Sequence, residues 1–225
     1  MLAFKAVTVA LAGVRILRKV SFEIEAAETV ALIGANGAGK TTTLRSVLGF
    51  TDVTGEILFN GTELTQVAPA KRPGFGIGYA PEDRRLFSAF TVEENIAMPG
   101  QVAKLSAAEL QSRLERIYDI LPELREMARR PAGSVSGGQG KMVALGRSLM
   151  IGRKLIMLDE PFQGLAPALA RRYAEALRRL RDADPEVALI ITESNPSLLK
   201  NFADRALVIE RGEVREGSLN TVEVA

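Results

Sequence analysis

The sequence predicts an α/β fold with a mainly parallel core sheet, an antiparallel β subdomain and a helical subdomain. Short apolar runs, typical of buried parallel strands, alternate with amphipathic helical patterns along much of the chain. Near the N-terminus apolar and polar residues alternate instead, as they do in half-exposed antiparallel strands. From about residue 86 to residue 151 the pattern is helical, which indicates a helical insertion within the α/β frame.

Composition excludes several classes of protein. With 47% hydrophobic and 25% charged residues, the 225-residue chain is an ordinary globular sequence rather than a disordered one. It has no cysteine and no histidine, which excludes disulfides, thiolate metal sites and proton transfer by histidine. A net charge of +2 is too small to indicate nucleic acid as a partner. Lys5 interrupts the apolar start and no later run approaches the ~20 residues of a membrane span, so we expect membrane association only through partners.

The expected elements are marked by turn and capping residues. Antiparallel strands are expected over residues 4–9, 20–24 and 55–61, the last closed by an Asn-Gly turn, and a hairpin over 206–215. Buried strands are expected over residues 30–33, 76–80, 154–159 and 187–192. Helices are expected over residues 43–48, behind the capping boxes 91–94 and 106–109, from Ser136, and from Pro167. We interpret residues 1–225 as a single domain whose helical subdomain spans approximately 86–151.

A glycine-rich segment lies between the first of these buried runs, residues 30–33, and the helix expected over residues 43–48. It matches the pattern G-x-x-x-x-G-K-[ST], whose glycines let consecutive backbone N–H groups point into one hollow at a helix N-terminus. Lys40 is expected to reach the β- and γ-phosphates of a nucleotide, and Thr41 to bind Mg²⁺. A turn that binds nothing is disfavoured because every fixed position of the motif is present. The predicted nucleoside triphosphate site comprises Gly34, Asn36, Gly37, Ala38, Gly39, Lys40, Thr41 and Thr42.

Two carboxylates follow the buried run 155–158. Asp159 is well placed to hold Mg²⁺ directly or through water, as phosphoryl transfer requires. Glu160 can orient and polarise the water that attacks the γ-phosphate. The alternative is that both residues merely cap the following turn, which Pro161 and the phosphate loop together disfavour.

A second candidate anion site is the helix start Ser136-Gly137-Gly138-Gln139. The phosphate loop already serves the chain's own nucleotide. The second site is therefore expected to serve a nucleotide held by another copy.

The phosphate loop, residues 136–139 and residues 158–161 occur in the order and spacing of ABC-type ATPase domains, which the chain resembles over nearly its whole length. Residues 33–43, 79–87, 91–96 and 164–167 resemble the ATP-binding subunits of branched-chain amino acid type importers, and the smaller of that family's two ATPase subunits is the closest in length. The resemblance implies a P-loop NTPase fold with ATP and Mg²⁺ as cofactors. It also implies that two ATPase subunits pair head to tail, with ATP between the phosphate loop of one and the signature helix of the other.

The resemblance also implies partners and a location. The second ATPase subunit is expected to be a related but different chain. The other partners are two membrane-spanning permease subunits and, indirectly, an extracytoplasmic solute-binding protein, with the chain peripheral on the cytoplasmic face of the membrane. The family's coupling helices dock around residues 82–90, which makes Arg84, Arg85 and Phe87 candidate partner contacts.

Several positions depart from the family pattern. Residues 10–13 lack the aromatic ring that usually stacks on adenine, a contact worth roughly 1–3 kcal/mol, so ATP is expected to bind more weakly or less selectively. Ser194 stands where the family has a histidine touching the γ-phosphate; a serine donates one hydrogen bond but carries no charge. Glu82 stands where most members have glutamine, and it can bind Mg²⁺ or water but cannot donate to phosphate. Both replacements also resemble the branched-chain branch. Nothing explains Phe162 and Gln163, which replace small or polar residues.

We therefore expect an ATP-hydrolysing subunit of an importer for branched-chain amino acids or a related small polar solute. One rival is a catalytically degenerate, nucleotide-binding regulatory partner, which the missing ring and histidine favour and Glu160 opposes. Another is a soluble ABC-type protein of translation or DNA repair, which would carry a second ATPase domain or a coiled-coil insertion. The sequence leaves the solute open among branched-chain amino acids, urea, amides and aromatic acids. It also leaves open whether the working dimer pairs identical or unlike chains.

Overall fold

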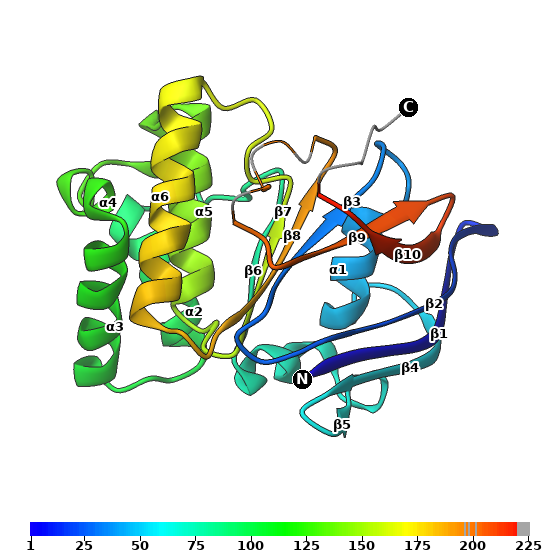
Figure 1. Ribbon diagram of the computed structural model, residues 1–225. Helices are drawn as coiled ribbons and strands as arrows, with labels where there is room; N and C mark the ends of the chain where they lie inside the picture. Colours follow the sequence, from blue (N-terminus) through cyan, green and yellow to red (C-terminus); the bar gives the residue numbers. More distant parts are fainter. Residues whose placement is uncertain (196, 198, 201, 220–225) are drawn as a thin grey trace. The chain divides into compact units, whose positions relative to one another are not determined.

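The computed structural model describes residues 1–195, 197, 199–200 and 202–219, in two compact units. The first unit is Met1–Phe75 together with the chain from Ala188 onwards, and the second is Gly76–Val187. Strands and helices of both units are shown in Figure 1. The α/β class is confirmed, and the grouping of residues 1–225 into one domain stays a prediction.

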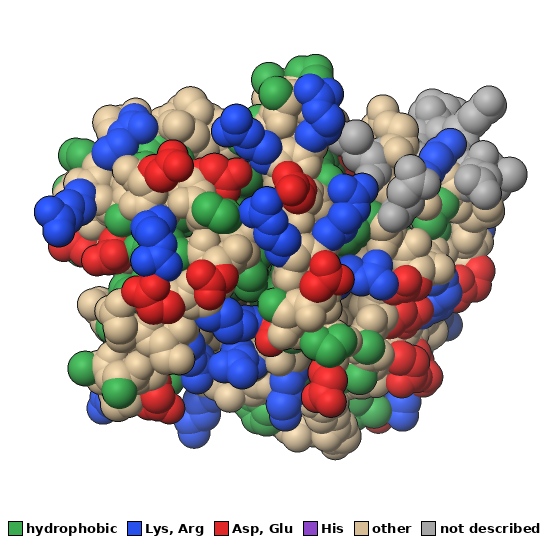
Figure 2. Space-filling model, turned by 60° about the vertical axis from the view of Figure 1, so that its left-hand side comes forward, with side chains coloured by type: hydrophobic (Ala, Val, Ile, Leu, Met, Phe, Trp, Pro, Cys, Tyr) green, Lys and Arg blue, Asp and Glu red, His purple; other side chains and the backbone are tan. Residues whose placement is uncertain are grey.

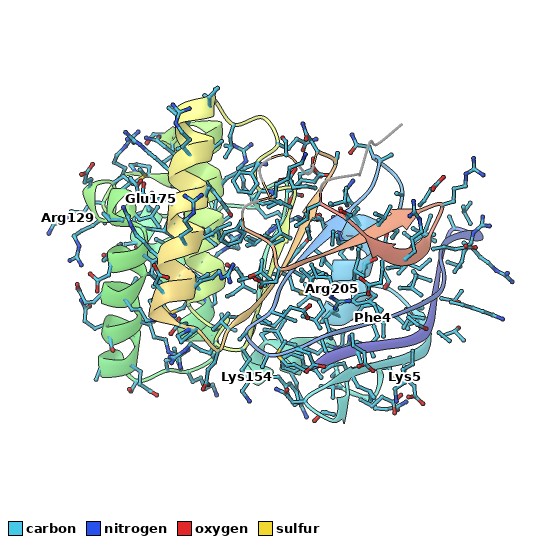
Figure 3. The ribbon with its side chains drawn as sticks, in the orientation of Figure 1. Phe4, Lys5, Arg129, Lys154, Glu175 and Arg205 are labelled. Carbon is cyan, nitrogen blue, oxygen red and sulfur yellow. The ribbon has the colours of Figure 1, made fainter. Side chains whose placement is uncertain are left out.

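An antiparallel sheet forms one part of the first unit, in the order β2-β1-β4-β5. Its strands are β1 (Leu2–Leu11), β2 (Val14–Ile24), β4 (Val53–Phe59) and β5 (Thr62–Glu63). The predicted alternation is confirmed, because Leu2, Phe4, Val7 and Val9 are buried. Phe4, labelled in Figure 3, lies on β1. Its ring stacks on that of Phe22 on the neighbouring strand, with centroids 4.4 Å apart. The Asn-Gly turn joins β4 to β5, with positive φ at both Asn60 and Gly61.

Parallel strands form the other part of the first unit. β3 (Thr29–Ile33) lies between β8 (Ala188–Glu193) and β9 (Arg205–Glu210), and both pairings are parallel. β10 (Glu213–Gly217) closes the predicted hairpin with β9. Every residue of β3 and β8 is buried, as the continuous apolar runs predicted. In this register Ile33 is opposite Glu193, which brings the carboxyl ends of β3 and β8 together.

An α-helix of the first unit follows β3 after residues 34–39. It is α1 (Lys40–Leu48), and it ends at Gly49 in the left-handed conformation. The short 3₁₀ turns Leu64–Gln66 and Pro69–Phe75 follow the antiparallel sheet. From the second of these turns, buried Arg72 donates to the carbonyl oxygens of Ser46 and Val47 at 3.0 and 2.9 Å. This contact satisfies acceptors that the last turn of α1 leaves without helical partners.

The second unit combines a parallel strand pair with helices. β6 (Ile77–Ala80) pairs with β7 (Leu155–Asp159). The helices are α2 (Val92–Val102), α3 (Ala107–Ile120), α4 (Pro122–Glu126), α5 (Gly137–Leu149) and α6 (Pro167–Ala183), with a 3₁₀ turn at Ala132–Ser134. Reciprocal capping boxes begin α2 at Thr91, α3 at Ser106 and α5 at Ser136, and the first two were predicted from their spacing.

The long helices bury one face each. In α3, Leu114 and Ile117 are buried, whereas Leu121 lies just beyond the helix because Pro122 follows it. α6 buries Tyr173, Leu177 and Leu180, and it runs alongside α3 (Figure 1). Figure 2 shows basic and acidic side chains interspersed over one face of the molecule. Among the described residues, none of the helices is both long and apolar enough to cross a membrane.

Candidate functional site

The phosphate loop spans residues 34–39, between the end of β3 and the start of α1. Gly37 and Gly39 have φ values of +80° and +116°, which residues with a Cβ rarely adopt. Gly34 is required for another reason, because an added Cβ would overlap the carbonyl oxygen of Ile209 on β9. The local chain therefore needs glycine at these three positions to make a tight strand-to-helix turn.

Lys40 is buried within this turn, with a relative exposure of 5%. Its ammonium group donates to the carbonyl oxygens of Gly34 at 2.6 Å and Ala35 at 3.0 Å. The positive charge therefore lies against the loop's own backbone, close to the N-terminus of α1. No acidic residue occurs in the first turn of α1, which also contains Thr41 and Thr42. A helix start with this charge pattern attracts anions.

Ser194 joins the phosphate loop from the end of β8. Its hydroxyl oxygen lies 3.4 Å from Nζ of Lys40 and donates to Oδ1 of Asn36 at 3.0 Å. The parallel register of β3 and β8 explains the contact, since Ile33 and Glu193 are paired immediately before these segments. Three residues predicted to bind nucleotide thus form one cluster in the first unit.

In the second unit, Asp159 ends β7 and Glu160 follows it, and both are buried, with exposures of 2% and 4%. The hydroxyl of Tyr79 on β6 donates to Oδ2 of Asp159 at 3.0 Å. Glu160 has φ +47°, in the left-handed region. Its carbonyl oxygen accepts a hydrogen bond of 2.5 Å from Nζ of Lys141. The two residues are therefore held by contacts with different elements: β6 contacts the carboxylate of Asp159, and α5 contacts the backbone carbonyl of Glu160.

The helix start at Ser136 has the geometry that its sequence predicts. The Ser136 hydroxyl accepts from the backbone N–H of Gln139 at 3.2 Å, while the Gln139 side chain accepts from the backbone N–H of Ser136 at 3.0 Å. Gly138 allows α6 to approach, because an added Cβ would overlap the side chain of Leu169. Arg84 donates to the carbonyl oxygen of Gly137 at 3.3 Å.

The segment 82–90 follows β6 and contains exposed Glu82. Arg84 and Arg85 both have positive φ, and Arg147 of α5 donates to their carbonyl oxygens at 2.5 and 2.6 Å. Phe87 is 50% exposed and stacks on Phe90, which is 43% exposed, with centroids 5.6 Å apart. An ordered backbone thus presents two adjacent aromatic rings to solvent.

The turn where adenine stacking is expected in related proteins contains Ala12 and Gly13, both with positive φ. Leu11, at the end of β1, is 44% exposed. The structure therefore leaves an apolar side chain at this turn but no ring.

The structure groups the predicted residues in two sets. Asn36, Lys40 and Ser194 contact one another in the first unit. Glu82, residues 136–139, Asp159 and Glu160 belong to the second unit. Sequence reasoning missed Tyr79, Lys141 and Arg147, since each contact depends on strand pairing or helix packing between segments distant in the sequence. No local pattern marked them.

Comparisons with known proteins agree with the motifs. Residues 17–163 match the family model described as ABC transporter. The branched-chain amino acid transport ATP-binding protein BraG of Pseudomonas aeruginosa is 38% identical over 215 residues, covering 95% of this chain and 91% of the relative. A probable counterpart, LivF of Archaeoglobus fulgidus, is 33% identical over 200 residues, covering 88% and 84%.

Solved structures give the same result. The ADP conformation of an ATP-binding cassette of an ABC transporter superposes with a TM-score of 0.84 at 25% identity, covering 99% of this chain and 94% of the other. Another ATP-binding subunit of an ABC transporter also gives 0.84, at 27% identity and with 98% and 90% coverage. The predicted resemblance and P-loop fold are confirmed. The comparisons give the catalytically degenerate alternative no support.

Proposed function

Because the chain belongs to the ABC transporter family, we propose that it hydrolyses ATP to power an importer for branched-chain amino acids or a related small polar solute. The observation that carries this proposal is the buried pair Asp159 and Glu160 in a chain that also has a complete phosphate loop. Phosphoryl transfer requires both a phosphate cradle and carboxylates for metal and water. One chain thus supplies both parts.

The phosphate loop holds the triphosphate. Backbone N–H groups of the loop and of the first turn of α1, including Thr42, bind phosphate oxygens. Lys40 exchanges its contacts with the carbonyl oxygens of Gly34 and Ala35 for contacts with the β- and γ-phosphates. Ser194 contributes a neutral hydrogen bond at the position where the family usually has a histidine.

The donor set suits Mg²⁺. Thr41, Asp159 and Glu82 offer oxygen atoms, and Mg²⁺ is usually held by one or two carboxylates together with substrate phosphates. Among the described residues no three or more His, Cys, Asp or Glu side chains form a metal cluster by themselves. When bound, the metal neutralises charge on the phosphates.

Glu160 orients the attacking water and polarises it. The chain has no histidine for this task, so a buried carboxylate is the available base. The N-terminus of α5 binds the nucleotide that a second ATPase subunit holds. The residues that contact this nucleotide are Ser136, Gly137, Gly138 and Gln139. Reciprocal binding of this kind requires a head-to-tail dimer, and we propose a related but different chain as the partner.

The importer supplies the remaining partners. Two membrane-spanning permease subunits respond to ATP binding and hydrolysis, and an extracytoplasmic solute-binding protein delivers the solute to them. The chain docks on the cytoplasmic face of these two permease subunits through the segment 82–90. Arg84, Arg85 and Phe87 provide the contact, supported by the exposed stack of Phe87 and Phe90.

The test is ATP turnover by the purified chain, alone and mixed with its candidate partner subunit, beside Glu160→Gln. We expect the variant to lose most of the Mg-ATP hydrolysis, at least about 100-fold, and to keep nucleotide binding, because only the base is removed. Glu175→Gln is the matched control, since Glu175 is an exposed carboxylate on α6 (Figure 3). It should hydrolyse ATP like the wild type.

Reconstitution with the permease subunits in proteoliposomes then tests the solute. ATP-dependent uptake of leucine, isoleucine or valine is expected, with Glu160→Gln inactive. If Glu160→Gln matches the wild type in the assembled complex, Glu160 is idle and the regulatory-partner function replaces this one.

A further inference from the structure

Lys141 connects the helix that begins at Ser136 to the carboxylate proposed to activate water. It lies two residues beyond Gln139, in the first turns of α5. Its Nζ donates to the backbone carbonyl oxygen of Glu160 at 2.5 Å. The contact joins residues 19 positions apart in the sequence, and neither their residue types nor their spacing predicts it.

The peptide that Lys141 contacts has an unusual conformation. Glu160 is not glycine, yet its φ is +47°. Such backbone conformations persist only where surrounding contacts hold them. The same carbonyl oxygen also accepts from the backbone N–H of Gln163 at 3.3 Å. A local turn bond and one bond from another element therefore fix the orientation of this peptide.

The same turn also packs against α6 through Phe162. Phe162 is 6% exposed and meets the ring of Tyr173 edge-on, with centroids 5.4 Å apart. Lys141 and Asp159 also line a small pocket together with Pro161 and Tyr173. Lys141 itself is half-buried, and its bond to Glu160 therefore lies at the edge of this packed turn.

We propose that Lys141 is a positioning residue: it holds the Glu160 peptide in its left-handed conformation, so that the carboxylate points where the attacking water must be activated. The same bond makes the orientation of Glu160 depend on the position of α5. This inference rests on the proposed function, because it concerns the step that Glu160 performs. In this role Lys141 acts through Glu160 and does not itself contact the nucleotide or the attacking water.

The test compares Lys141→Met, Lys141→Gln and Lys141→Arg in the full chain mixed with its candidate partner subunit, with kcat and the KM for ATP measured separately. We expect Lys141→Met to lower kcat about tenfold or more, since misplacing a reacting group by about 1 Å can cost on the order of 100-fold. The KM for ATP should stay within about twofold, because the phosphate loop is unchanged. Lys141→Arg, which keeps a long cationic donor, should recover most of the rate.

Matched controls separate positioning from folding and from loss of charge. Lys154→Met removes an exposed lysine of the same unit and should behave as the wild type (Figure 3). Lys141→Gln keeps a donor but removes the charge, and we expect it to fall between Lys141→Met and Lys141→Arg. Binding of Mg-ATP, followed by calorimetry, should be the same for all variants, which also reports folding if turnover is lost.

Two results overturn the inference while leaving the proposed function intact. One is a wild type that hydrolyses ATP beside a Lys141→Met variant with an unchanged kcat. The other is a variant whose loss appears in KM or in ATP binding and is not recovered by arginine. A wild type that hydrolyses no more ATP than Glu160→Gln overturns the proposed function, and the inference with it.

Discussion

The hydroxyl of Tyr79 donates a hydrogen bond of 3.0 Å to Oδ2 of Asp159, between adjacent parallel strands of the second unit. A partner of this kind fixes the rotamer of a carboxylate and determines which oxygen stays available to a ligand. Asp159 is only 2% exposed, so its orientation depends on such contacts rather than on solvent. Outer hydrogen-bond partners of metal ligands commonly affect affinity.

Tyr79→Phe should therefore raise the Mg²⁺ concentration that half-saturates ATP hydrolysis, by about tenfold. The ring remains, so the fold should not change. Titration of Mg²⁺ at fixed ATP measures the effect. Tyr118→Phe is the matched control, because it also removes a phenol-to-carboxylate hydrogen bond, to Glu93 at 2.6 Å. Equal shifts in both variants would show that Tyr79 has no special relation to the metal.

Ser194 contacts Lys40 and Asn36 through one hydroxyl, whereas Lys40 also contacts two backbone carbonyl groups. Ser194→Ala should therefore weaken ATP binding by only about threefold, since a neutral hydrogen bond contributes about 1 kcal/mol or less. Lys40→Ala should nearly abolish binding, because it removes the charge that faces the phosphates. Displacement of a fluorescent ATP analogue measures both.

Ser21→Ala serves as the control for Ser194→Ala. The Ser21 hydroxyl on β2 accepts from the backbone N–H of Ala6 at 2.9 Å, so this variant also loses one hydroxyl contact. Its ATP affinity should be that of the wild type. If Ser194→Ala binds ATP as poorly as Lys40→Ala, Ser194 contributes far more than one neutral hydrogen bond and the prediction is wrong.

The elements were predictable from sequence because their signals are local. The capping box at Ser106, the Asn60-Gly61 turn and the buried run before Asp159 each lie within a few residues, and each gave the correct element. Residue contacts were less predictable. Ser194 was placed near the nucleotide by resemblance, but its bond to Asn36 requires the register of β3 and β8. Arg147 binds backbone carbonyl groups of Arg84 and Arg85, for which side-chain identity gives no signal.

An ion pair in the first unit predicts how stability depends on pH. Arg205 on β9 (Figure 3) donates to Oε1 of Glu28 at 2.7 Å, and the backbone N–H of Glu25 donates to its other oxygen at 2.9 Å. Burial raises the pKa of Glu28, but the hydrogen bonds from Arg205 and Glu25 and the guanidinium charge outweigh it, so the pKa lies below its usual value of 4.5. The folded state therefore binds this proton less readily than the unfolded state does.

The direction in which stability changes with pH follows from that difference in proton binding. Above pH 4.5 the stabilisation by Glu28 is fully present, and it is lost as the pH falls below 4.5 through the lowered pKa of the folded state. Glu28→Gln should reduce the free energy of unfolding by about 1 kcal/mol at pH 7 and by much less in acid. Urea unfolding across this range measures the difference. Glu213 is an exposed carboxylate on β10. The free energy of unfolding of Glu213→Gln should change with pH as that of the wild type does. A gap between wild type and Glu28→Gln that stays constant with pH would show that the pair contributes no charge-dependent stability.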